Sequence, residues 1–210
     1  MTPPRDTLLV FAKAPVPGLV KTRLAADVGV DEAARVYRTM GRRIVDRVRT
    51  GPQRTLVCFD PPDAQPLVRR WLGDANLEFW PQEGTDLGER MMLAFRRAFG
   101  GADRVCVIGT DVPDLGRSQV SAAFNALERC DVVFGPANDG GYYLLALGRP
   151  VPSLFQDMAW STASVLRESL ARAHAAGLVV ECLAPLDDVD TAADLQRHPG
   201  LQDFAGTADK

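Results

Sequence analysis

Three cationic side chains follow the first apolar run of the chain, in a segment rich in proline and glycine. They are Lys13, Lys21 and Arg23, and between the two lysines lie Pro15, Pro17 and Gly18. Proline stiffens a loop, glycine lets its backbone approach a ligand, and cations at the carboxyl end of a strand suit a polyphosphate. The spacing is not the Walker pattern, because only Gly18 and Lys21-Thr22 match it. The segment therefore predicts a phosphate-binding loop; the alternative is a solvated loop with incidental cations.

Two carboxylates follow a later apolar run. Asp111 and Asp114 come directly after residues 105–109. Carboxylate oxygens, together with substrate phosphates, are the ligands that Mg²⁺ and Mn²⁺ prefer. Asp111 leaves the expected strand first, so we expect it to hold the metal. For Asp114 we expect a capping role at the helix that begins near Gly116 or Ser118.

A second acidic cluster lies near the end of the sequence and contains Asp187, Asp188 and Asp190. Three acids within four residues repel one another unless a cation lies nearby. If this segment folds back toward Asp111, it supplies a second metal contact. Capping of the last helix by Asp190 or Thr191 is the alternative, and both roles can hold together.

Two glycine-containing segments complete the candidate site. Asn138-Asp139-Gly140-Gly141 is a strong turn signal, which explains the glycines but not why Asp139 is followed by two tyrosines that could flank a substrate. In residues 84–90, Asp86 and Glu89 have the form of a capping box at a helix start. Helix starts also bind anions or nucleotide hydroxyls, and capping does not explain Arg90.

Short apolar runs alternate with amphipathic stretches along the chain. This alternation predicts a largely parallel sheet with helices on both faces, an α/β fold. Only five residues separate Pro136 from Tyr142, too few for a crossover helix, so we expect one strand there to be antiparallel. The expected strands are 7–12, 55–59, 77–80, 104–109, 131–136, 142–147 and 179–183, and the expected helices are 31–49, 66–72, 87–99, 118–129 and 162–176, the last with Ser161 or Thr162 as N-cap and Gly177 just past its end.

Composition narrows the class of protein. The chain has 210 residues and a net charge of −3 with both signs interspersed, which predicts a single domain and gives no support to a nucleic-acid or anionic-membrane partner. No apolar stretch reaches the length of a membrane span, and the first apolar run is too short for a signal peptide, so we expect a cytoplasmic protein. The cysteines are expected to be buried free thiols: Cys58, Cys106, Cys130 and Cys182. Neither His174 nor His198 lies in a pattern of nucleophilic catalysis.

Taken together, these segments resemble the DUF2064-type family of bacterial transferases, described with radical-SAM and selenodomain proteins and placed in the GT-A, or nucleotide-diphospho-sugar transferase, superfamily. The resemblance runs from residue 7 to about 195. It rests on Phe11-Ala12-Lys13, Pro17-Gly18, Lys21-Thr22-Arg23-Leu24, Asp86-Leu87-Gly88-Glu89-Arg90-Met91, Gly109-Thr110-Asp111-Val112-Pro113, Gly135-Pro136-Ala137, Asp139-Gly140-Gly141-Tyr142, Trp160-Ser161-Thr162 and Asp188-Val189-Asp190-Thr191.

The resemblance implies a three-layer α/β/α sandwich with a mainly parallel mixed sheet. It implies a nucleotide-binding half at about 6–115, an acceptor-binding half at about 116–200 and a polar tail at 201–210, which we expect to fray. Asp111 resembles the first acid of a D-x-D-like metal element, although Pro113 stands where the second acid would be, and Asp190 resembles the late acid of related metal sites.

The predicted site residues follow from the motifs and the resemblance together. The metal, Mg²⁺ or Mn²⁺, is assigned to Asp111 and Asp190. Lys21, Arg23, Asp111 and Asp139 are the predicted catalytic residues. Nucleotide binding is assigned to Ala12, Lys13, Gly18, Lys21, Arg23, Asp86, Gly88, Arg90 and Thr110, and acceptor binding to Asp139, Gly140, Gly141, Tyr142 and Trp160.

The cations favour one reaction over another. When a nucleoside triphosphate is attacked at its α-phosphate, the leaving pyrophosphate carries several negative charges that a cationic loop can neutralise. We therefore expect a nucleotidyltransferase that acts on a small phosphorylated or hydroxylated acceptor. The alternatives are a glycosyltransferase that uses a nucleotide-sugar, with Asp139 as general base, and a nucleotide-binding module without catalysis. Oligomeric state is not indicated by the sequence.

Overall fold

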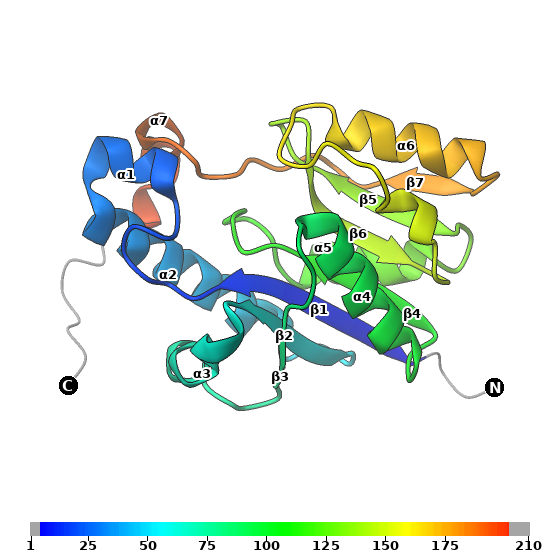
Figure 1. Ribbon diagram of the computed structural model, residues 1–210, viewed down its shortest axis with the longest axis horizontal. Helices are drawn as coiled ribbons and strands as arrows, with labels where there is room; N and C mark the ends of the chain where they lie inside the picture. The colour runs from blue at the N-terminus through cyan, green and yellow to red at the C-terminus, as the bar shows by residue number, and fades with distance from the viewer. Residues whose placement is uncertain (1–4, 202–210) are drawn as a thin grey trace.

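The strands of the central sheet bury apolar side chains on both faces of the sheet. In the strand β1 (Asp6–Lys13), Leu8 and Val10 point to one face and Leu9 to the other, and all three are fully buried. Because successive side chains of a strand alternate between faces, such a strand requires an apolar layer on each side. The computed structural model, which describes residues 5–201, has these two layers (Figure 1).

The sheet has seven strands in the order β3-β2-β1-β4-β6-β5-β7. All neighbours are parallel except β6, which runs antiparallel to both β4 and β5. The expected mixed sheet and its single reversed strand are therefore confirmed. The remaining strands are β2 (Arg54–Asp60), β3 (Glu78–Pro81), β4 (Arg104–Ile108), β5 (Val132–Pro136), β6 (Tyr142–Leu147) and β7 (Val180–Cys182).

Helices cover the two faces unequally. The larger core packs one face against α2 (Val30–Val48), α3 (Gln65–Leu72) and α5 (Arg117–Ala126), and the smaller core packs the other against α4 (Leu87–Phe99) and α6 (Val165–Ala175). Two short helices, α1 (Thr22–Val28) and α7 (Ala192–Gln196), lie side by side at one end (Figure 1). Single 3₁₀ turns occupy Pro62–Ala64, Pro152–Leu154 and Pro199–Leu201. Within residues 5–201, no helix has the length and apolarity needed to cross a membrane.

Several local expectations are corrected. The sequence analysis placed residues 21–24 in a loop, whereas Arg23 and Leu24 belong to α1, which is too short to give a clear apolar period. Helix α6 begins at Val165 rather than Thr162, and its N-cap position is Ser164 instead of Ser161 or Thr162; Ser161 itself has a left-handed φ of 62° and lies in the preceding loop. Gly177, with a φ of 68°, does follow the end of α6 as expected.

Two further expectations concern caps and thiols. Gly116, not Asp114, is the N-cap of α5, and the helix ends at Ala126 instead of Arg129. All four cysteines are free, but only Cys58 and Cys106 are buried; Cys130 is half-buried and Cys182 is exposed at the edge strand β7. Of the predicted tail 201–210, Leu201 is buried in the larger core, and residues 202–210 lie outside the described residues.

The chain crosses back over the sheet edge after β7. An extended segment leaves β7 and runs to α7 beside α1, as the orange trace of Figure 1 shows. Leu186 forms a parallel bridge with Ala137, and the Val189 N–H donates to the carbonyl of Asp111 at 3.1 Å. This crossing brings the late acidic cluster to the carboxyl end of β4. The fold-back toward Asp111, on which the predicted second metal contact depended, is therefore present.

Candidate active site

Lys21 joins the two acids predicted to hold a metal. Its Nζ lies 2.7 Å from Asp111 Oδ1 and 2.8 Å from Asp190 Oδ1. The Lys21 side chain is only 4% exposed, whereas those of Asp111 and Asp190 are 52% and 32% exposed. Burial disfavours the charge on Lys21, but the two carboxylates outweigh it and raise the pKa of the ammonium. The three predicted residues therefore form one charged cluster.

The position of Asp190 is fixed by its neighbours. Its Oδ2 accepts from Arg23 at 3.3 Å, and its backbone N–H donates to Asp194 Oδ2 at 3.1 Å. Asp194 in turn forms a reciprocal capping box with Thr191 at the start of α7. The predicted cap by Thr191 is thus confirmed, and Asp190 is left to face Lys21.

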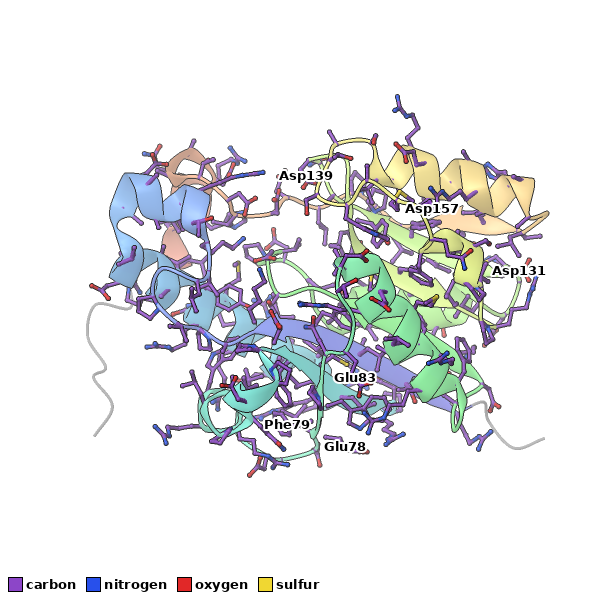
Figure 2. The ribbon with its side chains drawn as sticks, in the orientation of Figure 1. Glu78, Phe79, Glu83, Asp131, Asp139 and Asp157 are labelled. Carbon is purple, nitrogen blue, oxygen red and sulfur yellow. The ribbon has the colours of Figure 1, made fainter. Side chains whose placement is uncertain are left out.

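More negative charge surrounds the cluster. Asp188 is half-buried, and its burial, followed by the nearby charges of Asp190 and Asp139, raises the pKa of its carboxyl. Asp139 lies at the tip of the β5–β6 turn, which faces the crossing segment (Figure 2). The turn is tied to that segment by Asn138 Nδ2, which donates to Asp187 Oδ1 at 2.7 Å. The acids therefore outnumber the cations here.

Tyr37 braces the candidate site from within the core, and sequence reasoning did not single it out. Its hydroxyl accepts from the Lys13 N–H at 2.9 Å and from Thr110 Oγ1 at 3.0 Å, and donates to the Lys13 carbonyl at 3.3 Å. Burial, followed by the charge of Asp111, raises the pKa of this hydroxyl. Tyr37 therefore fixes the end of β1 against the residue that precedes Asp111. In the sequence it looked like one apolar position of a helix stripe.

Asp60 was also missed. It ends β2 beside Lys13, its register partner, and its Oδ2 lies 3.2 Å from Arg90 Nη1. The same Arg90 donates to the Gly84 carbonyl at 3.1 Å, so it holds the loop before α4 against the sheet. An acid at the end of a buried strand is the signal that singled out Asp111, and it would have found Asp60 as well.

Gly88 and Trp160 bring the two halves of the molecule into contact. A Cβ on Gly88 would lie 2.3 Å from Trp160 Nε1 and 2.6 Å from the Phe155 carbonyl oxygen. Gly88 is buried at the first turn of α4, which begins after the N-cap Asp86 as predicted. The loop before α6 therefore rests on the helix that follows the Gly84 loop, and glycine is required at the contact.

The two tyrosines after the turn do not flank one pocket. Adjacent strand residues point to opposite faces, so Tyr142 packs against Phe134 near Ser169, whereas the Tyr143 hydroxyl donates to the Ala184 carbonyl at 3.0 Å. That expectation is wrong for the pair. The glycines shape the turn instead: a Cβ on Gly140 would lie 2.2 Å from the Ala163 carbonyl oxygen, and the Gly141 N–H donates to Asp139 Oδ1.

Of the remaining residues predicted to bind the nucleotide, two are exposed and two are buried. Lys13 and Gly18 are exposed, and Gly18 has a φ of 81° that favours glycine. Ala12 and Thr110 are buried: Ala12 is the penultimate residue of β1, and Thr110, two residues after β4, turns its hydroxyl to Tyr37. Any contact that these two make with a nucleotide would come from the backbone.

Comparisons with known proteins agree with this fold. The fold is similar to that of a Desulfovibrio desulfuricans protein provisionally described as a nucleotide-diphospho-sugar transferase (TM-score 0.87, 36% identity, 95% of this chain and 89% of that one). The sequence is 28% identical over 180 residues to a 2-phospho-L-lactate guanylyltransferase of Methanothermobacter thermautotrophicus, covering 83% of this chain and 76% of the relative. In fold alone it is similar to Rv0371c of Mycobacterium tuberculosis in complex with manganese (TM-score 0.57, 16% identity, 92% and 97% covered).

The fold and these relatives define a transferase of the GT-A-like, nucleotide-diphospho-sugar transferase superfamily. Residues 44–162 match the family described as an uncharacterized protein conserved in bacteria, DUF2064, and the chain belongs to that family.

Proposed function

We propose that the protein is a metal-dependent nucleotidyltransferase that transfers a nucleoside monophosphate to a small phosphorylated or hydroxylated acceptor. The observation that carries this proposal is the convergence of Lys21, Arg23, Asp111 and Asp190 at one end of the sheet. A triphosphate needs cations, and a divalent ion that bridges phosphates needs carboxylates. The 28% identical guanylyltransferase supports the same reaction class.

The carboxylates fit a metal that shares its ligands with a substrate. Asp111 Oδ1 and Asp190 Oδ1 already converge on a single atom, Lys21 Nζ. Within residues 5–201, no three acidic, histidine or cysteine side chains are arranged to hold a metal unaided. Mg²⁺ commonly binds through one or two carboxylates plus phosphates and water, so a two-carboxylate site suits it. When bound, such an ion polarises the α-phosphate and neutralises the developing charge.

The side chains divide the work of the reaction. Lys21 and Arg23 neutralise the pyrophosphate that leaves, which is the group with the greatest negative charge. The loop that Arg90 holds against Asp60 positions the nucleoside. Asp139, Gly140, Gly141 and Trp160 border the acceptor, while Tyr142 contributes only through its place at the start of β6.

Glycosyl transfer is the second candidate, because Asp139 is exposed beside the acidic cluster and could accept a proton from an acceptor hydroxyl. In that reaction a nucleoside diphosphate leaves, and pyrophosphate is not formed. The two candidates therefore differ in their product.

The deciding experiment measures both ligand preference and product. Each of the four nucleoside triphosphates, and a panel of nucleotide-sugars, is tested by thermal shift with Mg²⁺ or Mn²⁺. A ligand at about 100 times its dissociation constant stabilises by about 2.7 kcal/mol. Ligands that bind are then incubated with phosphorylated and hydroxylated acids, 2-phospho-L-lactate first. Pyrophosphate release supports the proposal; stabilisation by nucleotide-sugars alone, with nucleoside diphosphate release, overturns it.

A further inference from the structure

The ammonium of Lys21 occupies the point on which the metal-binding oxygens converge. It contacts Oδ1 of both Asp111 and Asp190, and its side chain is almost completely buried. The other oxygen of Asp190 is held by Arg23. Both oxygens of Asp190 are therefore engaged by protein cations in the structure.

A divalent ion and the Lys21 ammonium compete for these oxygens. An ion that took Oδ1 of either acid would meet the positive charge of Lys21 at close range, because that charge already lies within hydrogen-bond distance of the same atom. Repulsion between cations is strong where water is excluded. The ion can bind with full affinity only after the ammonium leaves.

We propose that Lys21 is an internal counterion that holds the metal position closed until a nucleotide polyphosphate takes its ammonium. This inference rests on the proposed function. The phosphates provide the anionic partner that Lys21 needs away from Asp111 and Asp190, and the released carboxylates then bind the ion. Metal and nucleotide therefore enter as coupled ligands, and the free protein holds the metal weakly.

The backbone at Lys21 supports this role. Lys21 has φ 48° and ψ 47°, in the left-handed region, where a residue with a Cβ is strained. It directly precedes α1 and has no side-chain cap bond. Its conformation therefore aims the side chain at the carboxylates at some cost, which the two ion pairs offset.

The coupling has a reciprocal consequence. If nucleotide binding raises metal affinity by releasing Lys21, the metal raises nucleotide affinity by the same factor. Removal of the ammonium should therefore raise metal affinity in the free protein and weaken metal-free nucleotide binding. A general loss of positive charge near Asp190 would change both affinities to a similar extent in variants of Lys21 and of the exposed Arg23, so the comparison of these two residues is decisive.

The test measures Mn²⁺ binding to the free protein by the loss of the free-ion paramagnetic resonance signal. Lys21→Met is compared with Arg23→Gln, which removes one positive charge from the same cluster but from an exposed side chain. We expect Lys21→Met to raise Mn²⁺ affinity by at least about tenfold, and Arg23→Gln by less than about threefold because exposed charges are screened. Binding of the four triphosphates in EDTA should weaken by about tenfold in Lys21→Met.

A second variant guards against misfolding. Lys21→Asn removes the ammonium and suits the left-handed backbone, so it should lose less thermal stability than Lys21→Met and show the same gain in Mn²⁺ affinity. Unchanged or weaker Mn²⁺ binding in both folded variants, or an equal gain in Arg23→Gln, overturns the inference. If the wild type binds no nucleotide at all, the proposed function fails, whereas the Mn²⁺ comparison still decides whether Lys21 occupies the metal position.

Discussion

The strands β1 and β4 carry charged groups at both ends, and the two ends are built differently. At the amino end, Asp6 and Arg104 are register partners joined by two hydrogen bonds of 2.7 and 2.8 Å, and the exposed Glu128 lies 3.8 Å from Arg104. At the carboxyl end, Lys21 is shared by Asp111 and Asp190, with further acids behind them. A matched pair satisfies its charges within the protein, whereas the surplus of acids leaves charge for a ligand cation to balance.

The largest expected effect comes from breaking the carboxyl end. Asp111→Asn should lower kcat/KM by about 10³-fold, or about 4 kcal/mol of transition-state stabilisation, because the metal loses a charged ligand. The free energy of unfolding should change little, because Lys21 keeps its ion pair with Asp190. Steady-state assays measure kcat/KM, and thermal unfolding measures the stability. Asp114→Asn, an exposed acid three positions later, is the matched control and should retain activity. Activity of Asp111→Asn within tenfold of wild type would contradict the assignment.

At the amino end we expect the opposite result, a loss of stability without a loss of activity. Arg104→Met should lower the free energy of unfolding by about 3 kcal/mol, because Asp6 is left charged and mostly buried. The kcat should be unchanged at a temperature where the variant is folded. Urea unfolding measures the loss. Arg5→Met removes the exposed pair with Asp103 and should leave the free energy of unfolding nearly unchanged, because water and salt screen exposed charges. Equal losses in the two variants would show that burial does not distinguish these pairs.

Tyr37 links the two strands near the carboxyl end. Tyr37→Phe should lower stability by about 1–3 kcal/mol, because the buried Thr110 hydroxyl and the partly buried Lys13 N–H lose their acceptor. Nucleotide and Mn²⁺ affinity should also fall, since the residue before Asp111 is released. Trp71→Phe is the control: it loses a bond to the Arg38 carbonyl but leaves the Tyr37 hydroxyl in place. If Trp71→Phe lowers ligand affinity as much, Tyr37 has only a structural role.

The smallest expected effect concerns the support of Asp190. Burial acts to raise the pKa of the Asp194 carboxyl, but hydrogen bonds from Thr191 and Asp190, with the charge of Arg197, outweigh it and lower the pKa below the ordinary value of 3.8. Its stabilisation is therefore present above pH 3.8 and is lost as the pH falls through the lowered value. Asp194→Asn should cost about 1 kcal/mol at neutral pH and flatten that acid dependence. Urea unfolding as a function of pH measures it, and an unchanged acid profile would refute the role.

The sequence predicted most of the fold because the relevant signals are local. Alternating apolar runs located the strands, and the Asn138–Gly141 turn predicted the reversed strand β6. Asp111 followed from its place after a buried strand, and Asp60 was missed although it shows the same signal. Tyr37 could not be found by periodicity, because a helix stripe does not reveal where a buried hydroxyl donates. The bond from Lys21 to Asp190 spans 169 residues, so only the folded topology could show it.

The contact between Gly88 and Trp160 constrains how the family can diversify. A side chain at position 88 would overlap both an indole and a main-chain carbonyl, so a change of the bulky residue at 160 alone does not make room for one. The loop that carries Trp160, which we propose borders the acceptor, can therefore vary in sequence only while it keeps its present distance from α4. New acceptor specificities should arise from its tip, residues 161–164, and position 88 should stay glycine as they do.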